Sequence, residues 1–393
     1  MQKFLRFASG VATPMGTDIT GLVPTLAAAR LASTRRRIVE ALSAAGQDAS
    51  GLEAVEAGNR SAWCPETGLA LKQLRAGQAG VAGLQATLAL LGAGGRGNVV
   101  LGVEGQQWLY LDGWLIAASG ECRVSGAGEG SGITIESDAG RAVFAFEGGR
   151  WTPASGACGP WFAHAGGGLA PRYVTASRLT HHVEGFPWIA YGPGPGHDHA
   201  ARRDDDVRRI EVIGEGWRII RDEAPQYAYW VASTASGCLL LDPSGDHQAQ
   251  SGSCYDHPGL IAIEPPDCPV YCGELLVHEC SHQNMLAYMM VAPLTRPGSE
   301  ETHFSPIKRL HRTVDRVLTG AHAVGNMILY YRTLAAQRTL DPASQERMAL
   351  LERWFREDYA PALNASQSLT EAGGVFWDSL HGAVEGRQGT RAA

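Results

Sequence analysis

The feature that most constrains this chain is a helix-forming stretch near residue 280 that carries a metal-ligand motif. From Gly273 to Val291 the sequence holds no internal glycine or proline, so we expect one helix there. Within it stands His278-Glu279-Cys280-Ser281-His282, an HExxH motif. Residues four apart lie one above the other on the same face of a helix, so both imidazoles can bind one ion. The motif therefore predicts a metal site on this helix.

The surroundings of the motif favour metal binding over a chance match. Leu275-Leu276-Val277 directly precedes it and would bury one face of the helix, and an apparent strand lies upstream at 257–267. Two neutral imidazoles, a third ligand and open coordination positions make a catalytic site rather than a closed structural one. Glu279, the neighbour of His278, is the candidate catalytic carboxylate.

The usual third ligands of two metallopeptidase classes are missing. Met285 and Tyr288 stand where the metzincin pattern needs Gly and His, which excludes that class. A gluzincin needs a Glu on a downstream helix, but Glu300 and Glu301 lie in a Pro/Gly-containing loop. The third ligand must therefore come from elsewhere in the chain.

Three downstream histidines are candidates for that ligand. His303 lies in an expected loop, His311 in a basic run and His322 within an apolar helical stretch. A lone His on an apolar helix is more often a core residue, but beside an HExxH helix the ligand role is favoured. Gly320 and Gly325 flank His322 and would allow another backbone to approach closely. We therefore expect His278, His282 and His322 to form the metal site.

The composition limits the class of protein. In 393 residues, 45% hydrophobic and 19% charged, the chain can bury a sizeable core and form two or three domains. A net charge of -7 gives no indication of the positive charge with which proteins bind nucleic acid. No stretch approaches about 18 uninterrupted apolar residues, so no membrane span is expected. The eight cysteines are too few for a disulfide scaffold, and reduced thiols in a cytoplasmic protein are expected.

Changes in sequence pattern predict an α+β fold in three regions. Residues 1–95 are rich in Ala and Leu and are expected to be helical. Residues 96–200 contain short aromatic and β-branched runs, typical of antiparallel strands, and end in a Gly/Pro-rich linker. Residues 201–393 are expected to form a mainly helical metal-binding domain that contains the HExxH helix.

Several local patterns give further expectations. We expect strands at 227–242 and 257–267, a loop at 293–306 and helices at 313–337 and 342–358. Gly92-Ala93-Gly94-Gly95-Arg96-Gly97 matches GxGxxG, but it follows a helix and opens a strand, the reverse of a dinucleotide loop. His197-Asp198-His199 lies in a Gly/Pro-rich stretch, where a solvated loop is favoured over a second metal site.

Four segments in a fixed order add a family resemblance. They are SGS before HPGLIAIEP, then LLVHECSHQNM, HFSPIKRLHR and RVLTGAHAVGNMILYYR. From about Gly252 to Arg332 the chain therefore resembles the HExxH-motif peptide-modification proteins of ribosomal natural-product clusters. Ile307 stands where this family commonly has Trp, and Thr319 where some members carry His.

The resemblance implies an Fe(II)- and 2-oxoglutarate-dependent oxygenase. It implies that O₂ is used to hydroxylate the β-carbon of a side chain in a ribosomally made precursor peptide. The distal carboxylate of 2-oxoglutarate requires a cation, and an Arg fork suits it. Arg312 matches the Arg position of the family and Lys308 its basic position after Ser-Pro. Arg316, one turn beyond Arg312, is the reserve candidate.

Two other functions stay open from the sequence. The first is a zinc metallopeptidase in which Glu279 is the general base for metal-bound water. In an oxygenase Glu279 would instead orient a ligand or a water molecule, or bind the metal directly. The second is a metal-bearing or degenerate protein whose N-terminal half mainly binds a peptide partner, for example by strand addition. Asn326 and Gln283 are candidate partners of the metal ligands.

Overall fold

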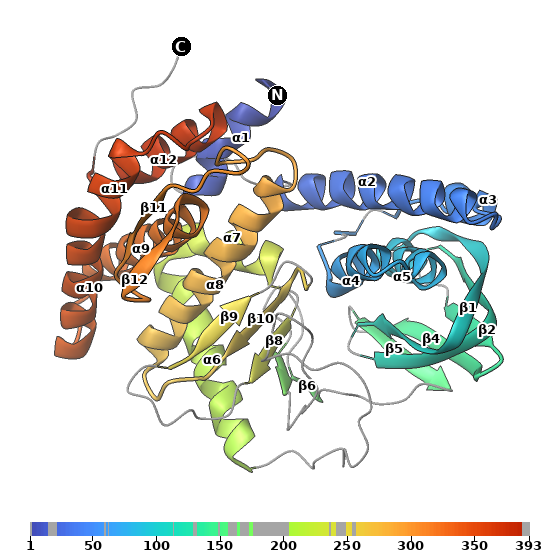
Figure 1. Cartoon of the computed structure of the whole chain (residues 1–393). Coiled ribbons are helices and arrows are strands. Elements are labelled where there is room, and N and C mark those ends of the chain that lie inside the picture. Colours follow the sequence, from blue (N-terminus) through green and yellow to red (C-terminus); the bar gives the residue numbers. More distant parts are fainter. Residues whose placement is uncertain are drawn as a thin grey trace. The chain divides into compact units, whose positions relative to one another are not determined.

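The computed structural model is a mixture of helix and sheet, with 56% of the residues that it describes in helices and 22% in strands, which confirms the α+β class (Figure 1). The residues that it describes are 2–14, 22–58, 60–61, 63–112, 114–128, 132–147, 150–155, 163–165, 173–175, 204–235, 237–240, 249–253 and 257–386. Most of the expected Gly/Pro linker, with His197, Asp198 and His199, lies outside these residues.

The chain divides into two compact units. The helical unit comprises Met1–Leu26, Arg209–Thr234 and Pro265–Ala393. The sheet unit comprises Ala27–Arg208 and Ala235–Glu264. The HExxH motif, His322 and the three candidate cations all belong to the helical unit. The predicted region boundaries near residues 95 and 200 stay predictions.

The sheet unit is built on an antiparallel meander in the strand order β1-β2-β3-β4-β5. Its strands are β1 (Arg96–Leu111), β2 (Trp114–Ala127), β3 (Ile133–Ser137), β4 (Gly140–Glu147) and β5 (Arg150–Ser155). The helices before it are α2 (Leu22–Ala44), α3 (Ser50–Ala54), α4 (Pro65–Arg75) and α5 (Ala79–Gly92). The apolar helix α5 is buried along most of its length and packs on α4, β1 and β2. The Gly-rich connection between α5 and β1 joins a helix to a strand, as predicted.

A second sheet in this unit has both parallel and antiparallel pairs. Its order is β6 (Ala163–Ala165), β7 (Tyr173–Thr175), β8 (Gly237–Leu240), β10 (Leu260–Ile263) and β9 (Ser251–Ser253). β10 pairs parallel with β8 and antiparallel with β9. β10 confirms the strand expected within 257–267.

The expected strand at 227–242 is wrong for most of its length. Residues Pro225–Thr234 form helix α7, and of the described residues in the range only Gly237–Leu240 form a strand. The buried side chains of α7, Tyr227, Trp230, Val231 and Thr234, follow helical spacing. Their aromatic and β-branched character suggested a strand, but the helical burial pattern decides the structure.

The helical unit surrounds the helix that carries the motif. Its elements are α1 (Gln2–Ala12), α6 (Asp204–Glu223, from Arg209 on), α7, α8 (Pro269–Met289), β11 (Thr302–Ser305), β12 (Leu310–Thr313), α9 (Val314–Ala335), α10 (Pro342–Trp354), a π-helical turn (Phe355–Tyr359), α11 (Ala360–Ala365) and α12 (Glu371–Val384). α8 packs against α9, α7 and α1. A methyl group on Gly273 would lie 2.3 Å from the hydroxyl of Tyr330, so a glycine is needed where α8 meets α9.

Two expectations in this unit need correction at their boundaries. α8 begins at Pro269 rather than Gly273, because a proline is well tolerated in the first helical turn. The loop expected at 293–306 ends in strand β11, which pairs with β12 in a hairpin. Arg309 lies in the turn of that hairpin with a positive φ of 53°. This backbone conformation is uncommon for a residue other than glycine, so it could not be predicted from the sequence.

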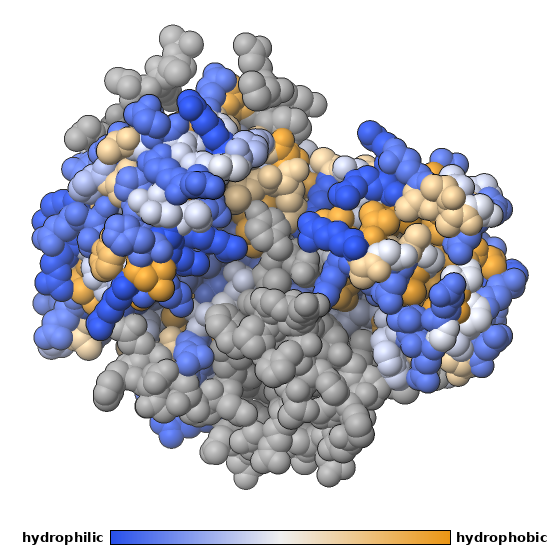
Figure 2. All heavy atoms as spheres, viewed as in Figure 1, coloured by the Kyte–Doolittle hydropathy of each residue, from blue (hydrophilic) through white to orange (hydrophobic). Residues whose placement is uncertain are grey.

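The surface of the helical unit is mainly polar. Figure 2 shows mostly hydrophilic side chains on its visible face, with small hydrophobic patches among them. Phe304 and Leu310, both on the β11–β12 hairpin, are large apolar side chains that are exposed. No helix in the described ranges is long and apolar enough to cross a membrane.

Candidate metal centre

His278 and His282 lie on successive turns of α8 with their Nε2 atoms 3.0 Å apart. Their rings are nearly perpendicular, at an interplanar angle of 88°. Two nitrogen ligands bound at about 2.1 Å and at right angles on one ion would be separated by about 3.0 Å. The same distance suits an N–H···N hydrogen bond between two neutral imidazoles. The pair therefore fits two adjacent coordination positions and has a satisfactory arrangement without an ion.

The electrostatic surroundings keep both imidazoles neutral. Burial, followed by the charges of His282 and Arg347, holds the pKa of His278 well below its usual range. Burial, followed by the charges of Arg316 and Arg312, lowers the pKa of His282 to about 4. Neutral imidazoles are the form that metal ions bind, so these two side chains need to lose no proton near pH 7.

The three predicted cations lie close enough to this pair to act on it. Lys308 follows β11, Arg312 lies on β12 and Arg316 lies in the first turn of α9. The charge of each contributes to the lowered pKa of His282. The hairpin and the start of α9 thus bring positive charge to the His278–His282 pair, the arrangement that an anionic co-substrate needs.

Glu279 is buried beside the first histidine of the pair. Its side chain is 1% exposed, and its Oε1 lies 3.6 Å from Nε2 of His278. That separation is slightly longer than a hydrogen bond. The carboxylate is near enough to accept a proton from a metal-bound water molecule as well as to orient His278.

His322 is buried on α9 between two aromatic rings. Its ring centroid lies 4.9 Å from that of Phe376 and 6.0 Å from that of Trp230. Its Nε2 lies 3.0 Å from the carbonyl oxygen of Val11, while its Nδ1 has no hydrogen-bond partner among the described residues. Burial, followed by the charge of His282, lowers its pKa to about 3. His322 is therefore a neutral imidazole with one bare nitrogen near the pair.

The described residues do not form a completed metal site. Among them, no three His, Cys, Asp or Glu side chains are arranged so that they could hold one ion together. The structure brings His278 and His282 to ligand spacing and places His322 within electrostatic reach of both. A third ligand would have to move toward the pair to complete the site.

Asn326 contacts His322 rather than the pair on α8. Its Nδ2 donates to the carbonyl oxygens of Ala12, at 3.0 Å, and His322, at 2.9 Å. Its Oδ1 accepts from the hydroxyl of Tyr227 at 3.0 Å. It therefore supports the predicted third ligand. Gln283, the other predicted partner, is buried on α8.

Sequence reasoning missed the contribution of Val11 and Ala12 to this site. Both contacts are made by backbone carbonyls at the end of α1. The residues that they join to α9 are 311 and 314 positions apart in the sequence. Backbone groups leave no side-chain signature, so the only available signal was the apolar spacing of residues 2–12.

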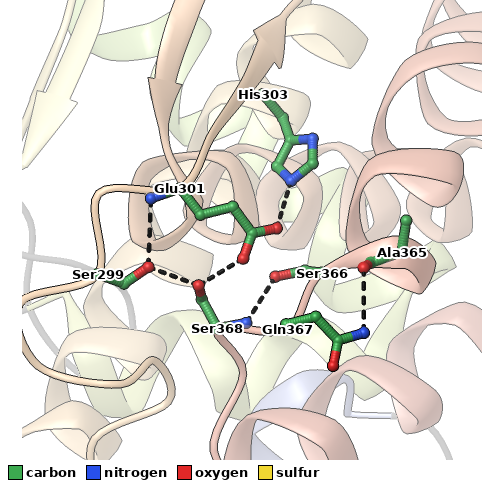
Figure 3. Close-up of polar contacts among 7 residues, drawn as sticks. All are labelled: Ser299, Glu301, His303, Ala365, Ser366, Gln367 and Ser368. Carbon is green, nitrogen blue, oxygen red and sulfur yellow. Dashed lines mark hydrogen bonds and ion pairs between the residues drawn. The ribbon is translucent and has the colours of Figure 1, made fainter.

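His303 has a different role from the one considered for it. Its Nε2 lies 2.7 Å from Oε1 of Glu301, and Glu301 also accepts a hydrogen bond from Ser368 (Figure 3). The bond from Ser368, followed by that from His303, lowers the pKa of Glu301 to about 2. This cluster fastens the segment after α8 to the segment before α12. His311 is exposed and lies against the ring of Phe304.

The comparisons with known proteins do not identify a family. No protein-family model matches this chain, and no curated protein matches it.

Proposed function

We propose that this protein is an Fe(II)- and 2-oxoglutarate-dependent oxygenase that hydroxylates the β-carbon of a side chain in a ribosomally made peptide. The observation that carries the proposal is the 3.0 Å separation of the His278 and His282 Nε2 atoms, with a third neutral imidazole and three cations around them. Three protein ligands on one side of an iron ion, with the other positions open, are typical of this enzyme class.

The residues have distinct tasks in this proposal. His278, His282 and His322 hold the metal, and the neutral state of all three leaves their lone pairs available. When bound, Fe(II) with 2-oxoglutarate and O₂ supplies the oxidising chemistry, which is that of the cofactors. Arg312 would pair with the distal carboxylate of 2-oxoglutarate through its planar fork, and Lys308 and Arg316 would add to the positive field.

A peptide substrate is supported by the resemblance of residues 252–332 and by the surface of the hairpin. Phe304 and Leu310 are 40% and 51% exposed and lie on the same hairpin as Arg312. Apolar side chains beside the cations can contact an extended peptide while its reactive residue points to the metal. We also propose a cytoplasmic location, where free thiols persist, because Cys122, Cys268, Cys272 and Cys280 are free thiols among the described residues.

A zinc metallopeptidase is the alternative, and the position of Glu279 favours it. A buried carboxylate 3.6 Å from a ligand histidine is well placed to take a proton from metal-bound water. The two functions share the metal site and differ in the reaction. A direct assay therefore separates them better than the site geometry does.

The test uses the full chain loaded with Fe(II) and 2-oxoglutarate without oxygen, with a candidate precursor peptide, and then exposed to O₂. We expect succinate and a peptide heavier by one oxygen atom. Succinate formed without peptide, by uncoupled turnover, would also support the oxygenase. Peptide cleavage by the zinc-loaded protein without O₂ would overturn the proposal in favour of the alternative.

A pair of histidine variants gives the control. His278→Ala should abolish succinate formation and metal retention, because it removes one of the two imidazoles at ligand spacing. His311→Ala removes an exposed imidazole on the hairpin and should leave metal retention and peptide-independent succinate formation unchanged. If His278→Ala retains full metal binding, the HExxH motif is not the metal site.

A further inference from the structure

The end of helix α1 and the metal-site residues on α9 form one connected structure. We propose that the carbonyl of Val11 fixes His322 in the tautomer with a bare Nδ1, so that His322 binds the metal through Nδ1, whereas His278 and His282 bind it through Nε2. This inference rests on the proposed metal site. It makes the N-terminal helix, which had no predicted function, part of the metal centre.

The hydrogen bond to Val11 determines which nitrogen of His322 carries the proton. A carbonyl oxygen only accepts, so Nε2, 3.0 Å away, must be the N–H donor. A neutral imidazole carries one proton, which leaves a lone pair on Nδ1. The side chain is fully buried, and Nδ1 has no hydrogen-bond partner among the described residues. A buried acceptor without a partner is costly, and a metal ion would satisfy it.

The rings around His322 oppose a flip of its imidazole, which would exchange Nδ1 with Cδ2 and Nε2 with Cε1. Phe376 and Trp230 lie on its sides, with interplanar angles of 58° and 33°. Trp230 is itself fixed, because its Nε1 donates to the carbonyl oxygen of Cys280, inside the motif, at 3.1 Å. The aromatic packing therefore ties the orientation of His322 to the helix that carries His278 and His282.

The C-terminal end of α1 is suited to this role. The last carbonyl groups of a helix have no partner within it and carry partial negative charge, so they attract N–H donors. Val11 and Ala12 are the last two residues of α1, and both carbonyls accept from α9, one from His322 and one from Asn326. The helix is held in place by its packing against α12 and α8. This arrangement, in which a carbonyl orients the non-ligating nitrogen of a histidine, is common at metal sites.

Two substitutions of His322 separate the tasks of its two nitrogens. The amide nitrogen of Gln can occupy the position of Nε2 and donate to Val11, but Gln has no ligand atom at the position of Nδ1. The amide oxygen of Asn can occupy the position of Nδ1, but Asn loses the donor to Val11. We therefore expect His322→Gln to keep the thermal stability of the native protein. It should bind Co(II) more than about 100-fold more weakly than the native protein, a larger loss than removal of a partner that only supports a metal ligand usually causes. We expect His322→Asn to be less stable and to bind Co(II) more tightly than His322→Gln.

A direct measurement is available that does not depend on variants or on activity. Long-range ¹H–¹⁵N spectra of the full chain with labelled histidine report the tautomer of each imidazole. Without metal, His322 should show a protonated Nε2 and a bare Nδ1. Adding Zn(II) as a probe should move the Nδ1 resonance of His322 and the Nε2 resonances of His278 and His282.

The outcomes distinguish this inference from the proposed function. If Zn(II) moves the resonances of His278 and His282 but neither nitrogen of His322, or moves its Nε2, the inference is wrong and the metal site stands. If Zn(II) moves none of the three histidines, the proposed function itself is wrong. Tighter Co(II) binding by His322→Gln than by His322→Asn would also overturn the role given to Nδ1.

Discussion

Glu274 and Arg347 form a buried ion pair one helical turn before His278. Nη2 of Arg347, on α10, lies 2.7 Å from Oε1 of Glu274, on α8, and Nε of Arg347 contacts both carboxylate oxygens at 3.1 Å. The hydroxyl of Tyr331, on α9, donates to Oε2 at 2.7 Å. This carboxylate therefore joins three helices at the level of the candidate metal site.

Removing only the cation of this pair should be strongly destabilising. Arg347→Met leaves the Glu274 carboxylate, which is 0% exposed, without its counter-charge. Breaking a buried pair in this way costs about 3–5 kcal/mol. The double variant Glu274→Gln/Arg347→Met leaves no buried charge and should regain much of this loss. Urea unfolding of both variants measures the difference, and equal losses would mean that the pair contributes little as a pair.

The buried histidines predict a stability that falls in acid. The pKa of His282 is lowered to about 4 and that of His322 to about 3, against 6.5 for an ordinary imidazole. Below pH 6.5 the unfolded chain therefore binds protons at these positions that the folded chain does not, so stability is lost as pH falls toward the folded values. Each such histidine contributes up to about 1.4 kcal/mol per pH unit.

Urea unfolding of the metal-free protein between pH 7.5 and 5 tests this dependence. His322→Gln cannot titrate, so its free energy of unfolding should fall less steeply with decreasing pH than that of the native chain. His311→Ala, which removes an exposed imidazole, should keep the native slope. Identical slopes for all three proteins would contradict a depressed pKa at His322.

The long periodic elements were predictable because their signals are local. α8 and α9 follow from uninterrupted apolar spacing, and the sequence placed both on the chain within a few residues of their observed ends. The α7 segment shows the limit of this approach. Its residue types favour a strand and its burial spacing favours a helix, and packing against α8 decides the outcome.

The candidate site was predictable only in part, because only some of its contacts are local in the sequence. His278 and His282 share one helix, so their proximity follows from helix geometry alone. The partners of His322 come from the two ends of the chain, Val11 near the N-terminus and Phe376 near the C-terminus. Such contacts depend on tertiary packing, which residue spacing along the sequence does not encode.

Glu279→Gln should separate the oxygenase from the peptidase. The amide keeps the size of the side chain but cannot act as a general base. Loss of general-base catalysis usually costs 10²- to 10⁴-fold, so a zinc peptidase should lose nearly all activity while retaining its metal. An oxygenase should keep succinate formation within about 10-fold, because its oxidising chemistry belongs to the cofactors. Peptide cleavage is measured on the zinc-loaded variant and succinate formation on the Fe(II)-loaded variant, and loss of metal from the variant would assign Glu279 to metal binding.

Asn326→Ala should loosen the end of α1. It removes the hydrogen bond from Nδ2 to Ala12 and leaves the Tyr227 hydroxyl without its bond to Oδ1. We expect a loss of about 1–3 kcal/mol in stability and faster hydrogen exchange in residues 2–14. If α1 supports the metal centre, Co(II) affinity should fall about 10- to 100-fold. Gln226→Ala is the matched control, because it removes a hydrogen bond between α7 and α9, to Thr333, without touching α1.

Arg312→Ala should weaken the binding of 2-oxoglutarate specifically. A hydrogen bond to a charged group contributes about 1.5–3 kcal/mol, so the KM for 2-oxoglutarate should rise about 10- to 150-fold. Arg312→Lys should recover only part of this loss, because an ammonium group lacks the planar fork. Arg309→Ala is the control, since Arg309 lies in the same hairpin but is absent from the charges that lower the pKa of His282. Uncoupled succinate formation at varied 2-oxoglutarate measures all three KM values. A rise for Arg309→Ala equal to that for Arg312→Ala would show that the hairpin acts through its total charge rather than through a specific contact from Arg312.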